Sequence, residues 1–211
     1  MPDEVLIEAE PAVAAELFGA RIDVAREFTR QLGERGEELG LIGPLEPPRL
    51  WTRHVLNSVL LAPLLRPGLV GDIGSGAGLP GLVLAIVRPD VEFVLIEPME
   101  RRVAWLEEQV QHLDLSNVAV RRARAEDVAR AYTLDQVTAR AVSAFSKLIP
   151  LTVPLVRTDG ELVLMKGANA EREVEAASKA IRKFHLEDVE VLTLGAGQVS
   201  EITRVIRARV A

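Results

Sequence analysis

Hydrophobic positions follow two different periods along this chain. Over residues 12–32, apolar side chains recur every three or four positions, which predicts a helix with one buried stripe. A second helical stretch is predicted over 48–65, and Pro67 and Gly68 end it. From Leu69 onward, short β-branched runs alternate with helical patterns. The chain is therefore predicted to begin with helices and to continue with alternating strands and helices.

The alternating part predicts the architecture of a sheet. Strands are predicted over 69–73, 91–97, 118–121, 136–140, 161–166 (after an Asp159-Gly160 turn), 189–194 and 202–208. Helices are predicted over 80–87, 99–113, 145–156 and 170–184, the third broken by Pro150 and Pro154. Such alternation is typical of an α/β fold with a mostly parallel, seven-stranded sheet, and the closing hairpin makes the last strand antiparallel. We expect a helical segment over 1–66, packed on a core of 67–211 within a single domain.

A glycine-rich loop joins the first strand to the next helix, in the segment Val70-Gly71-Asp72-Ile73-Gly74-Ser75-Gly76-Ala77-Gly78-Leu79-Pro80-Gly81. Glycines let the backbone turn tightly and approach a ligand, which predicts nucleotide binding. The spacing of Gly76, Gly78 and Gly81 also fits a dinucleotide fingerprint, which is a weak signal alone. Asp72 favours another ligand, because a carboxylate would repel a pyrophosphate at the helix N-terminus. The same carboxylate would stabilise the ammonium and sulfonium cations of S-adenosylmethionine.

Two further acids follow the next strands. Glu97 ends the second strand, where a carboxylate can accept hydrogen bonds from both ribose hydroxyls of either cofactor. After the third strand, the segment around Ala125 and Glu126 lies where methyltransferases that use S-adenosylmethionine hold the adenine. A structural explanation stays open for all three acids. Asp72 and Glu97 can cap the loop and the following helix, and Glu126 can be an acid favoured at a helix start.

Composition narrows the chemistry. The 211 residues include no cysteine, which excludes disulfides, cysteine-based zinc sites and iron–sulfur clusters. Methylation of pyrimidine carbon 5 and radical methylation also need cysteines and are excluded. Enzymes that methylate exocyclic amines carry an Asn/Asp-Pro-Pro-aromatic loop after the fourth strand, where this chain has Thr138-Ala139-Arg140-Ala141-Val142. A ring nitrogen, a hydroxyl or a carboxylate remains as the methyl acceptor.

Charge bears on partners and location. The net charge of −6 argues mildly against a nucleic-acid substrate, because phosphate neutralisation drives such binding. The first 20 residues carry five acids and no Lys or Arg, unlike a secretory signal. The longest run without a charged residue spans 15 residues and contains four glycines, too few apolar positions for a membrane span. We expect a soluble cytoplasmic monomer without a metal or membrane partner.

Several segments match one family in order and spacing, over about residues 12–208. They are Arg53-His54-Val55-Leu56-Asn57-Ser58, the stretch from Asp72 to Gly81, Val87-Arg88-Pro89, Arg124-Ala125-Glu126, Ala139-Arg140-Ala141 and Lys166-Gly167. With them the chain resembles the bacterial small-subunit (16S) ribosomal RNA guanine-N(7) methyltransferases, also called glucose-inhibited division protein B, of the actinobacterial type. It departs from that family at Asn57 and Ala139, where members commonly have Asp and Ser.

The resemblance implies a Rossmann-like class I methyltransferase fold, S-adenosylmethionine as cofactor, and 16S ribosomal RNA or the small ribosomal subunit as partner. Together with the motif residues, it gives the expected cofactor contacts Asp72, Gly74, Gly76, Leu79, Glu97, Ala125, Glu126 and Arg140. The expected substrate contacts are Arg53, His54, Arg124 and Lys166, and Arg140 and Lys166 are expected to position the reactants. No residue is assigned a chemical step, because ring nitrogen 7 of guanine has a lone pair and no proton, so catalysis is chiefly orientation.

Alternatives remain at this point. His54 can equally be a satisfied core histidine, and Arg53 and Lys166 can be solvated surface charges. Within the same fold, the substrate can be a small molecule or a protein. From a different class, a nicotinamide-dependent oxidoreductase would also use the glycine loop.

Overall fold

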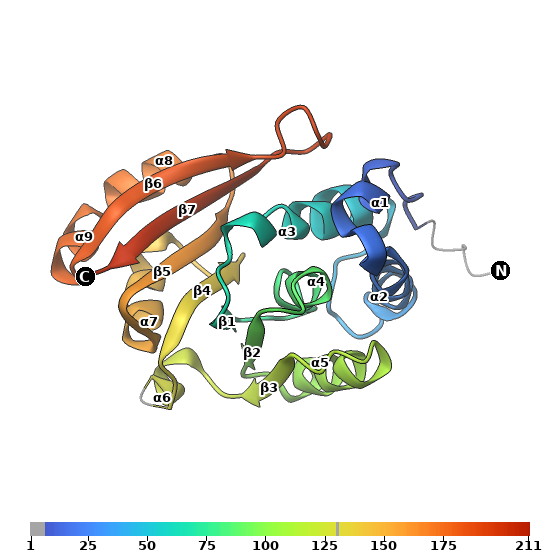
Figure 1. The fold of residues 1–211 in the computed structure, drawn as a ribbon, viewed down its shortest axis with the longest axis horizontal. Coiled ribbons are helices and arrows are strands. Elements are labelled where there is room, and N and C mark those ends of the chain that lie inside the picture. The colour runs from blue at the N-terminus through green and yellow to red at the C-terminus, as the bar shows by residue number, and fades with distance from the viewer. Residues whose placement is uncertain (1–6, 130) are drawn as a thin grey trace.

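The computed structural model describes residues 7–129 and 131–211, so the first six residues of the expected segment 1–66 lie outside the described part. The chain forms one seven-stranded sheet in the order β3-β2-β1-β4-β5-β7-β6 (Figure 1). The strands are β1 (Leu69–Ile73), β2 (Glu92–Glu97), β3 (Val118–Arg122), β4 (Leu134–Arg140), β5 (Val156–Lys166), β6 (Leu186–Leu194) and β7 (Thr203–Val210). The predicted Rossmann-like α/β fold is confirmed.

The pairing of the strands decides which loops lie together. β1 pairs in parallel with β2 and β4, β2 with β3, and β4 with β5, whereas β7 runs antiparallel to β5 and β6. The antiparallel last strand is thus confirmed. Ile73 lies beside Ile96 and Ala139, so β1, β2 and β4 end at one edge of the sheet. Lys166 pairs with Arg204, which brings the start of β7 to that same carboxyl edge.

Helices cover both faces of the sheet. They are α1 (Val13–Phe18), α2 (Ile22–Arg35), α3 (Asn57–Val59), α4 (Gly81–Val87), α5 (Glu100–His112), α6 (Ala125–Val128), α7 (Phe145–Thr152), α8 (Ala170–Ala176) and α9 (Ser178–Lys183). Short 3₁₀ turns occupy Gly19–Arg21, Pro47–Arg49, Ala62–Leu64 and Val153–Leu155, and Leu50–Leu56 is a π-helix. Figure 1 shows α1 to α5 gathered on one side and α7 to α9 on the other. Among the described residues, none of the helices has the length and apolar character that crossing a membrane requires.

Several predicted elements differ in detail. The helix predicted over 12–32 is divided by the 3₁₀ turn Gly19–Arg21, and the helix predicted over 170–184 is divided into α8 and α9. The stretch 48–65 is a series of 3₁₀, π and α turns, because prolines near its start and end interrupt regular α-helical bonding. The helix predicted over 145–156 ends at Thr152, and β5 begins at Val156, earlier than predicted. The predicted turn at Asp159 is a bulge within β5, where the register jumps and Asp159 has a φ of 62°.

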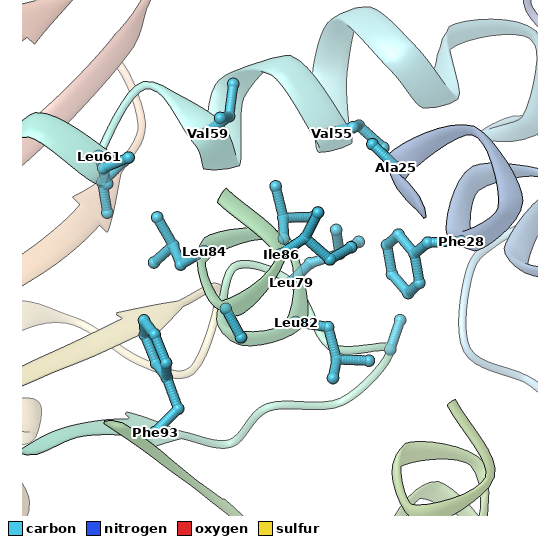
Figure 2. Packing of buried hydrophobic residues seen from close by; sticks show 14 of the residues in the cluster. Ala25, Phe28, Val55, Val59, Leu61, Leu79, Leu82, Leu84, Ile86 and Phe93 are labelled. Carbon is cyan, nitrogen blue, oxygen red and sulfur yellow. The ribbon is translucent and has the colours of Figure 1, made fainter. Parts of the chain in front are cut away.

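Two hydrophobic cores hold these layers together. On one face, Phe28 of α2 packs with Val55, Leu82 and Ile86 in a single cluster (Figure 2). That cluster also includes Phe93 of β2, so the N-terminal helices share a core with the sheet. The other face has its own cluster of α7, β4 and β5 side chains. The shared core fixes the N-terminal segment, and with it the π-helix, against the carboxyl edge of the sheet.

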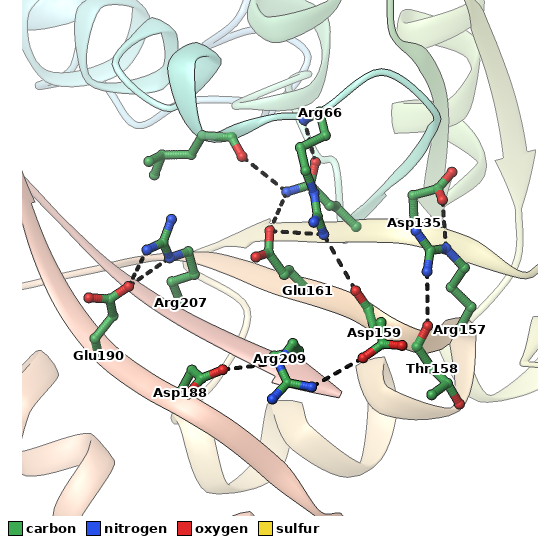
Figure 3. A network of polar contacts seen from close by, with 12 residues as sticks. Arg66, Asp135, Arg157, Thr158, Asp159, Glu161, Asp188, Glu190, Arg207 and Arg209 are labelled. Atoms are coloured by element: carbon green, nitrogen blue, oxygen red, sulfur yellow. Dashed lines mark hydrogen bonds and ion pairs between the residues drawn. The ribbon is translucent and has the colours of Figure 1, made fainter. Parts of the chain in front are cut away.

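The opposite, amino edge of the sheet carries a network of charged pairs (Figure 3). Arg157 donates to Asp135 at 2.7 Å, and Arg66 lies 3.3 Å from Glu161. Arg209 contacts three acidic side chains in the same way. These arginines are neutralised by neighbouring carboxylates, which indicates that this edge serves the fold.

Candidate active site

Two adjoining cavities open at the carboxyl edge of the sheet. The first, of about 610 Å³, lies between the glycine loop, the end of β2 and the N-terminal segment, and we call it the glycine-loop cavity. The second, of about 700 Å³, lies between the β4–α7 loop, the end of β5 and the β6–β7 hairpin, and we call it the hairpin cavity. Both are lined by Arg53, Arg140, Ala141 and Val142. Ligands in the two cavities would therefore meet at the residues that follow β4.

The glycine loop wraps one wall of the glycine-loop cavity. Gly74 and Gly78 have φ values of +69° and +93°, a left-handed backbone that favours glycine. A side chain at Gly74 would also meet Val142 at 2.9 Å. Gly74, Gly76 and Leu79 all line this cavity, so the structure brings these predicted cofactor residues together.

Asp72 lies behind the loop rather than in either cavity. The side chain is completely buried, and Oδ2 accepts a hydrogen bond of 3.1 Å from the backbone N–H of Gly81, which begins α4. The other oxygen, Oδ1, has no hydrogen-bond partner among the described residues. Burial raises the pKa of Asp72 to about 7, and the nearby Glu97 charge adds to the rise. A purely structural role of Asp72 in capping the loop and α4 thus accounts for Oδ2 but not for Oδ1.

Glu97 connects the glycine loop to the next helix. Oε2 accepts from the N–H of Gly76 at 2.9 Å, and Oε1 accepts from the N–H of Met99 at 3.0 Å. Glu97 also lines the glycine-loop cavity, although it is only 2% exposed. This carboxylate therefore holds the loop in shape, and its predicted contact with a ribose stays a prediction.

Arg140 occupies the boundary between the cavities. It is the last residue of β4, and Nη2 donates to Nδ1 of His54. Nη1 is buried without a partner in the described part of the chain. Burial lowers the pKa of Arg140 to about 10, which leaves the guanidinium charged at neutral pH. Arg140 therefore offers a charged donor with one free nitrogen beside both cavities.

Lys166 lines the hairpin cavity, but its ammonium group is engaged. Nζ donates to the backbone oxygen of Ser143 at 2.7 Å and to Glu173 at 2.8 Å, and the side chain is only 6% exposed. The same Glu173 oxygen accepts from the N–H of Phe145 at the start of α7. Lys166 and Glu173 thus fasten the loop that follows β4.

The other predicted residues are divided. Arg53 is half-exposed and lines both cavities, whereas His54 is buried and lines only the glycine-loop cavity. Arg124 and Glu126 are exposed and Ala125 is buried, and none of the three lines either cavity. Among residues 7–129 and 131–211, no group of His, Cys, Asp or Glu side chains is arranged to hold a metal ion.

Several residues that line the cavities were not predicted as site residues, and three of them matter for the chemistry. Glu46 lines the glycine-loop cavity, and Asn57 and Glu201 line the hairpin cavity. Glu46 and Glu201 lie in loops without a motif, so no local pattern distinguishes them from solvated acids. Asn57 follows the Arg-His pair by three positions, and that spacing was the available signal.

Comparison with known proteins identifies the relatives of this chain. The model of the family described as rRNA small subunit methyltransferase G matches residues 21–202. A protein of Clavibacter michiganensis named ribosomal RNA small subunit methyltransferase G is 83% identical over 100% of both chains. The protein of that name from Leifsonia xyli is 67% identical over 97% of this chain and 98% of its own length.

Solved structures share the fold at low sequence identity. A SAM-dependent methyltransferase from Aquifex aeolicus is 19% identical, with a TM-score of 0.56 over 78% of this chain and 94% of that chain. TYW2 of M. jannaschii, solved in complex with AdoMet, is also 19% identical, with a TM-score of 0.58 over 75% of this chain and 76% of that chain. These likenesses support the methyltransferase fold alone.

Proposed function

The chain belongs to the rRNA small subunit methyltransferase G family, and from this we propose that it transfers the methyl group of S-adenosylmethionine to ring nitrogen 7 of a guanine in 16S ribosomal RNA. The geometric observation that supports the proposal is the meeting of two cavities at Arg140, Ala141 and Val142. A methyl donor in the glycine-loop cavity and a base in the hairpin cavity would face each other at that boundary.

The residues around the glycine-loop cavity fit S-adenosylmethionine better than a dinucleotide. Asp72 and Glu97 are both buried carboxylates, and Asp72 keeps one oxygen without a partner. A pyrophosphate would meet their charge, whereas a cationic ligand is stabilised by it. When bound, S-adenosylmethionine supplies an electrophilic methyl group on a positively charged sulfur.

The chain's own contribution is orientation and electrostatics. Ring nitrogen 7 of guanine attacks with its lone pair and loses no proton, so no side chain has to act as a general base. Arg140 lines both cavities, and its guanidinium can donate to guanine O6, which neighbours nitrogen 7 and would fix the orientation of the base. Arg53 is half-exposed on the rim of both cavities and can bind a phosphate, which offsets the acidic net charge locally.

Mapping of 16S ribosomal RNA tests the substrate. N(7)-methylguanine carries a fixed positive charge, so borohydride reduction and aniline treatment cleave the RNA at the modified base. Cells that lack this gene should lose one cut, and the gene should restore it, whereas its Arg140→Ala form should not. If every cut persists in the deletion strain, the substrate assignment is wrong even though the chain can still be a methyltransferase.

Replacement of Glu97 tests the cofactor site. Glu97→Ala should weaken binding of S-adenosylmethionine by ~10–100-fold, because charge-assisted hydrogen bonds to two hydroxyls contribute ~1.5–3 kcal/mol. Loss of the two backbone contacts should also lower the free energy of unfolding by ~1–3 kcal/mol. Calorimetric titration and urea unfolding measure the two effects separately. Glu100→Ala is the matched control, since Glu100 is exposed and lines neither cavity. If Glu97→Ala bound S-adenosylmethionine with wild-type affinity, Glu97 would not be a cofactor contact.

A further inference from the structure

Three side chains form a chain of contacts beside the two cavities. Glu46 lies in the loop before the 3₁₀ turn Pro47–Arg49, His54 on the π-helix, and Arg140 at the end of β4. Nε2 of His54 lies 2.5 Å from Oε2 of Glu46, and Nδ1 of His54 contacts Nη2 of Arg140. His54 is 7% exposed, so solvent does not compete strongly for either ring nitrogen.

The chemistry of these groups fixes the tautomer of His54. A guanidinium group has only donors, so Nδ1 of His54 must accept from Arg140. The ring proton is therefore on Nε2, which donates to Glu46. Burial and the charge of Arg140 lower the pKa of His54 to about 4, although Glu46 acts in the opposite direction. His54 is consequently a neutral acceptor for Arg140 over the whole physiological pH range.

We propose that Glu46 and His54 are positioning residues that orient Arg140 for methyl transfer, rather than ligands of the RNA. His54 engages Nη2 of Arg140 at the boundary of the two cavities, and Nη1 has no partner among the described residues. This inference rests on the proposed function, in which Arg140 touches the substrate. It assigns a role to Glu46, which no sequence pattern indicated, and it changes the expected role of His54.

Glu46 is needed because a neutral imidazole has two tautomers. Without an acceptor at Nε2, the ring proton can move to Nδ1, and an N–H would then face the N–H groups of Arg140. Two donors cannot pair, so Arg140 would leave its position at the cavity boundary. Glu46 also lies 3.5 Å from Nε of Arg53, so one carboxylate holds two neighbouring residues of the π-helix. Replacing Glu46 with a residue that has no acceptor should therefore change the positions of Arg53 and Arg140, which both line the two cavities.

Substitutions at His54 separate positioning from packing. In Asn, a carbonyl oxygen can take the place of Nδ1, whereas Leu offers no acceptor. His54→Leu should reduce kcat by ~10–100-fold, as loss of an orienting partner does at other sites, and His54→Asn should recover most of that loss. Glu46→Gln, which keeps an oxygen acceptor, should likewise remain more active than Glu46→Leu. Equal activity of the Asn and Leu variants would overturn the proposal.

A double-mutant cycle tests whether His54 acts through Arg140. In an Arg140→Ala background, His54→Leu should reduce single-turnover methyl transfer by no more than ~2-fold further, because its only route of action is gone. Full additivity of the two losses would show that His54 acts independently. Wild-type turnover in His54→Leu would refute the positioning role and leave the proposed function intact.

The chain contains a matched control pair. Nε2 of His112 lies 2.6 Å from Oε1 of Glu27, between α5 and α2, and neither residue lines the glycine-loop cavity or the hairpin cavity. His112→Leu should leave kcat unchanged. Nitrogen NMR of the wild-type ring provides a readout without any substrate: His54 should be the neutral Nε2–H tautomer at pH 6 to 8. A protonated ring or the Nδ1–H tautomer would overturn the inference whatever the substrate is.

Discussion

Arg140→Ala should reduce kcat for methylation of 16S ribosomal RNA by at least ~100-fold, while the affinity for S-adenosylmethionine falls by less than ~10-fold. Arg140 lines both cavities and has a buried nitrogen without a partner, so its charge acts where the reactants meet. Such an interaction matters more for the reaction than for binding of one ligand. Single-turnover transfer of labelled methyl groups and calorimetric titration of the cofactor measure the two quantities.

Two comparison variants make this result specific. Arg157→Ala removes the same charge at the amino edge, where Arg157 pairs with Asp135, and should leave kcat unchanged. Arg140→Lys keeps the charge but loses the planar fork of donors, so it should recover only part of the activity. A similar loss of kcat in Arg140→Ala and Arg157→Ala would mean that net charge, and not position, is responsible.

The location of the site could be predicted from the sequence because it depends on sheet topology. The alternation of strands and helices indicated a parallel sheet, and ligands of such sheets bind at the carboxyl ends of the strands. The glycine loop and Glu97 end neighbouring strands, so their proximity follows from the order β2-β1. The position of Arg140 at the same edge is predictable for the same reason, since β4 lies on the other side of β1.

The state of each side chain could not be predicted in this way. Lys166 and Glu173 are seven positions apart in sequence, and the packing of α8 against α7 and β7 brings them together. The exposure of Arg124 and Glu126 depends on how the short α6 turns away from the cavities. The contact of Glu46, His54 and Arg140 joins three segments through tertiary packing, for which single-sequence periodicity carries no signal.

Asp72 should make the free energy of unfolding of the cofactor-free protein fall as the pH rises. The folded protein holds this proton up to about pH 7, whereas the unfolded chain releases it near the ordinary pKa of 3.8, so folding takes up a proton between these values. The contribution is complete below pH 3.8 and is lost as the pH rises to about 7. Asp72→Asn mimics the protonated form and lacks this pH dependence. The free energy of unfolding of Asp72→Asn relative to wild type should therefore be ~2–3 kcal/mol higher at pH 8 than at pH 5. Urea unfolding at the two pH values measures this difference.

Asp135→Asn is the control for this dependence. Asp135 also accepts from a backbone N–H of β1, that of Leu69, but its bond to Arg157 lowers the pKa, so it is ionised in both states above pH 5. The free energy of unfolding of Asp135→Asn should differ from that of wild type by the same amount at pH 5 and pH 8.

Saturating S-adenosylmethionine should reduce the pH dependence of the wild-type free energy of unfolding, because a bound cation favours the ionised form of Asp72. If the free energy of unfolding of Asp72→Asn differed from that of wild type by the same amount at both pH values, Asp72 would be ionised throughout. If the cofactor left the pH dependence of the wild-type free energy of unfolding unchanged, Asp72 would not interact with the charge of the cofactor.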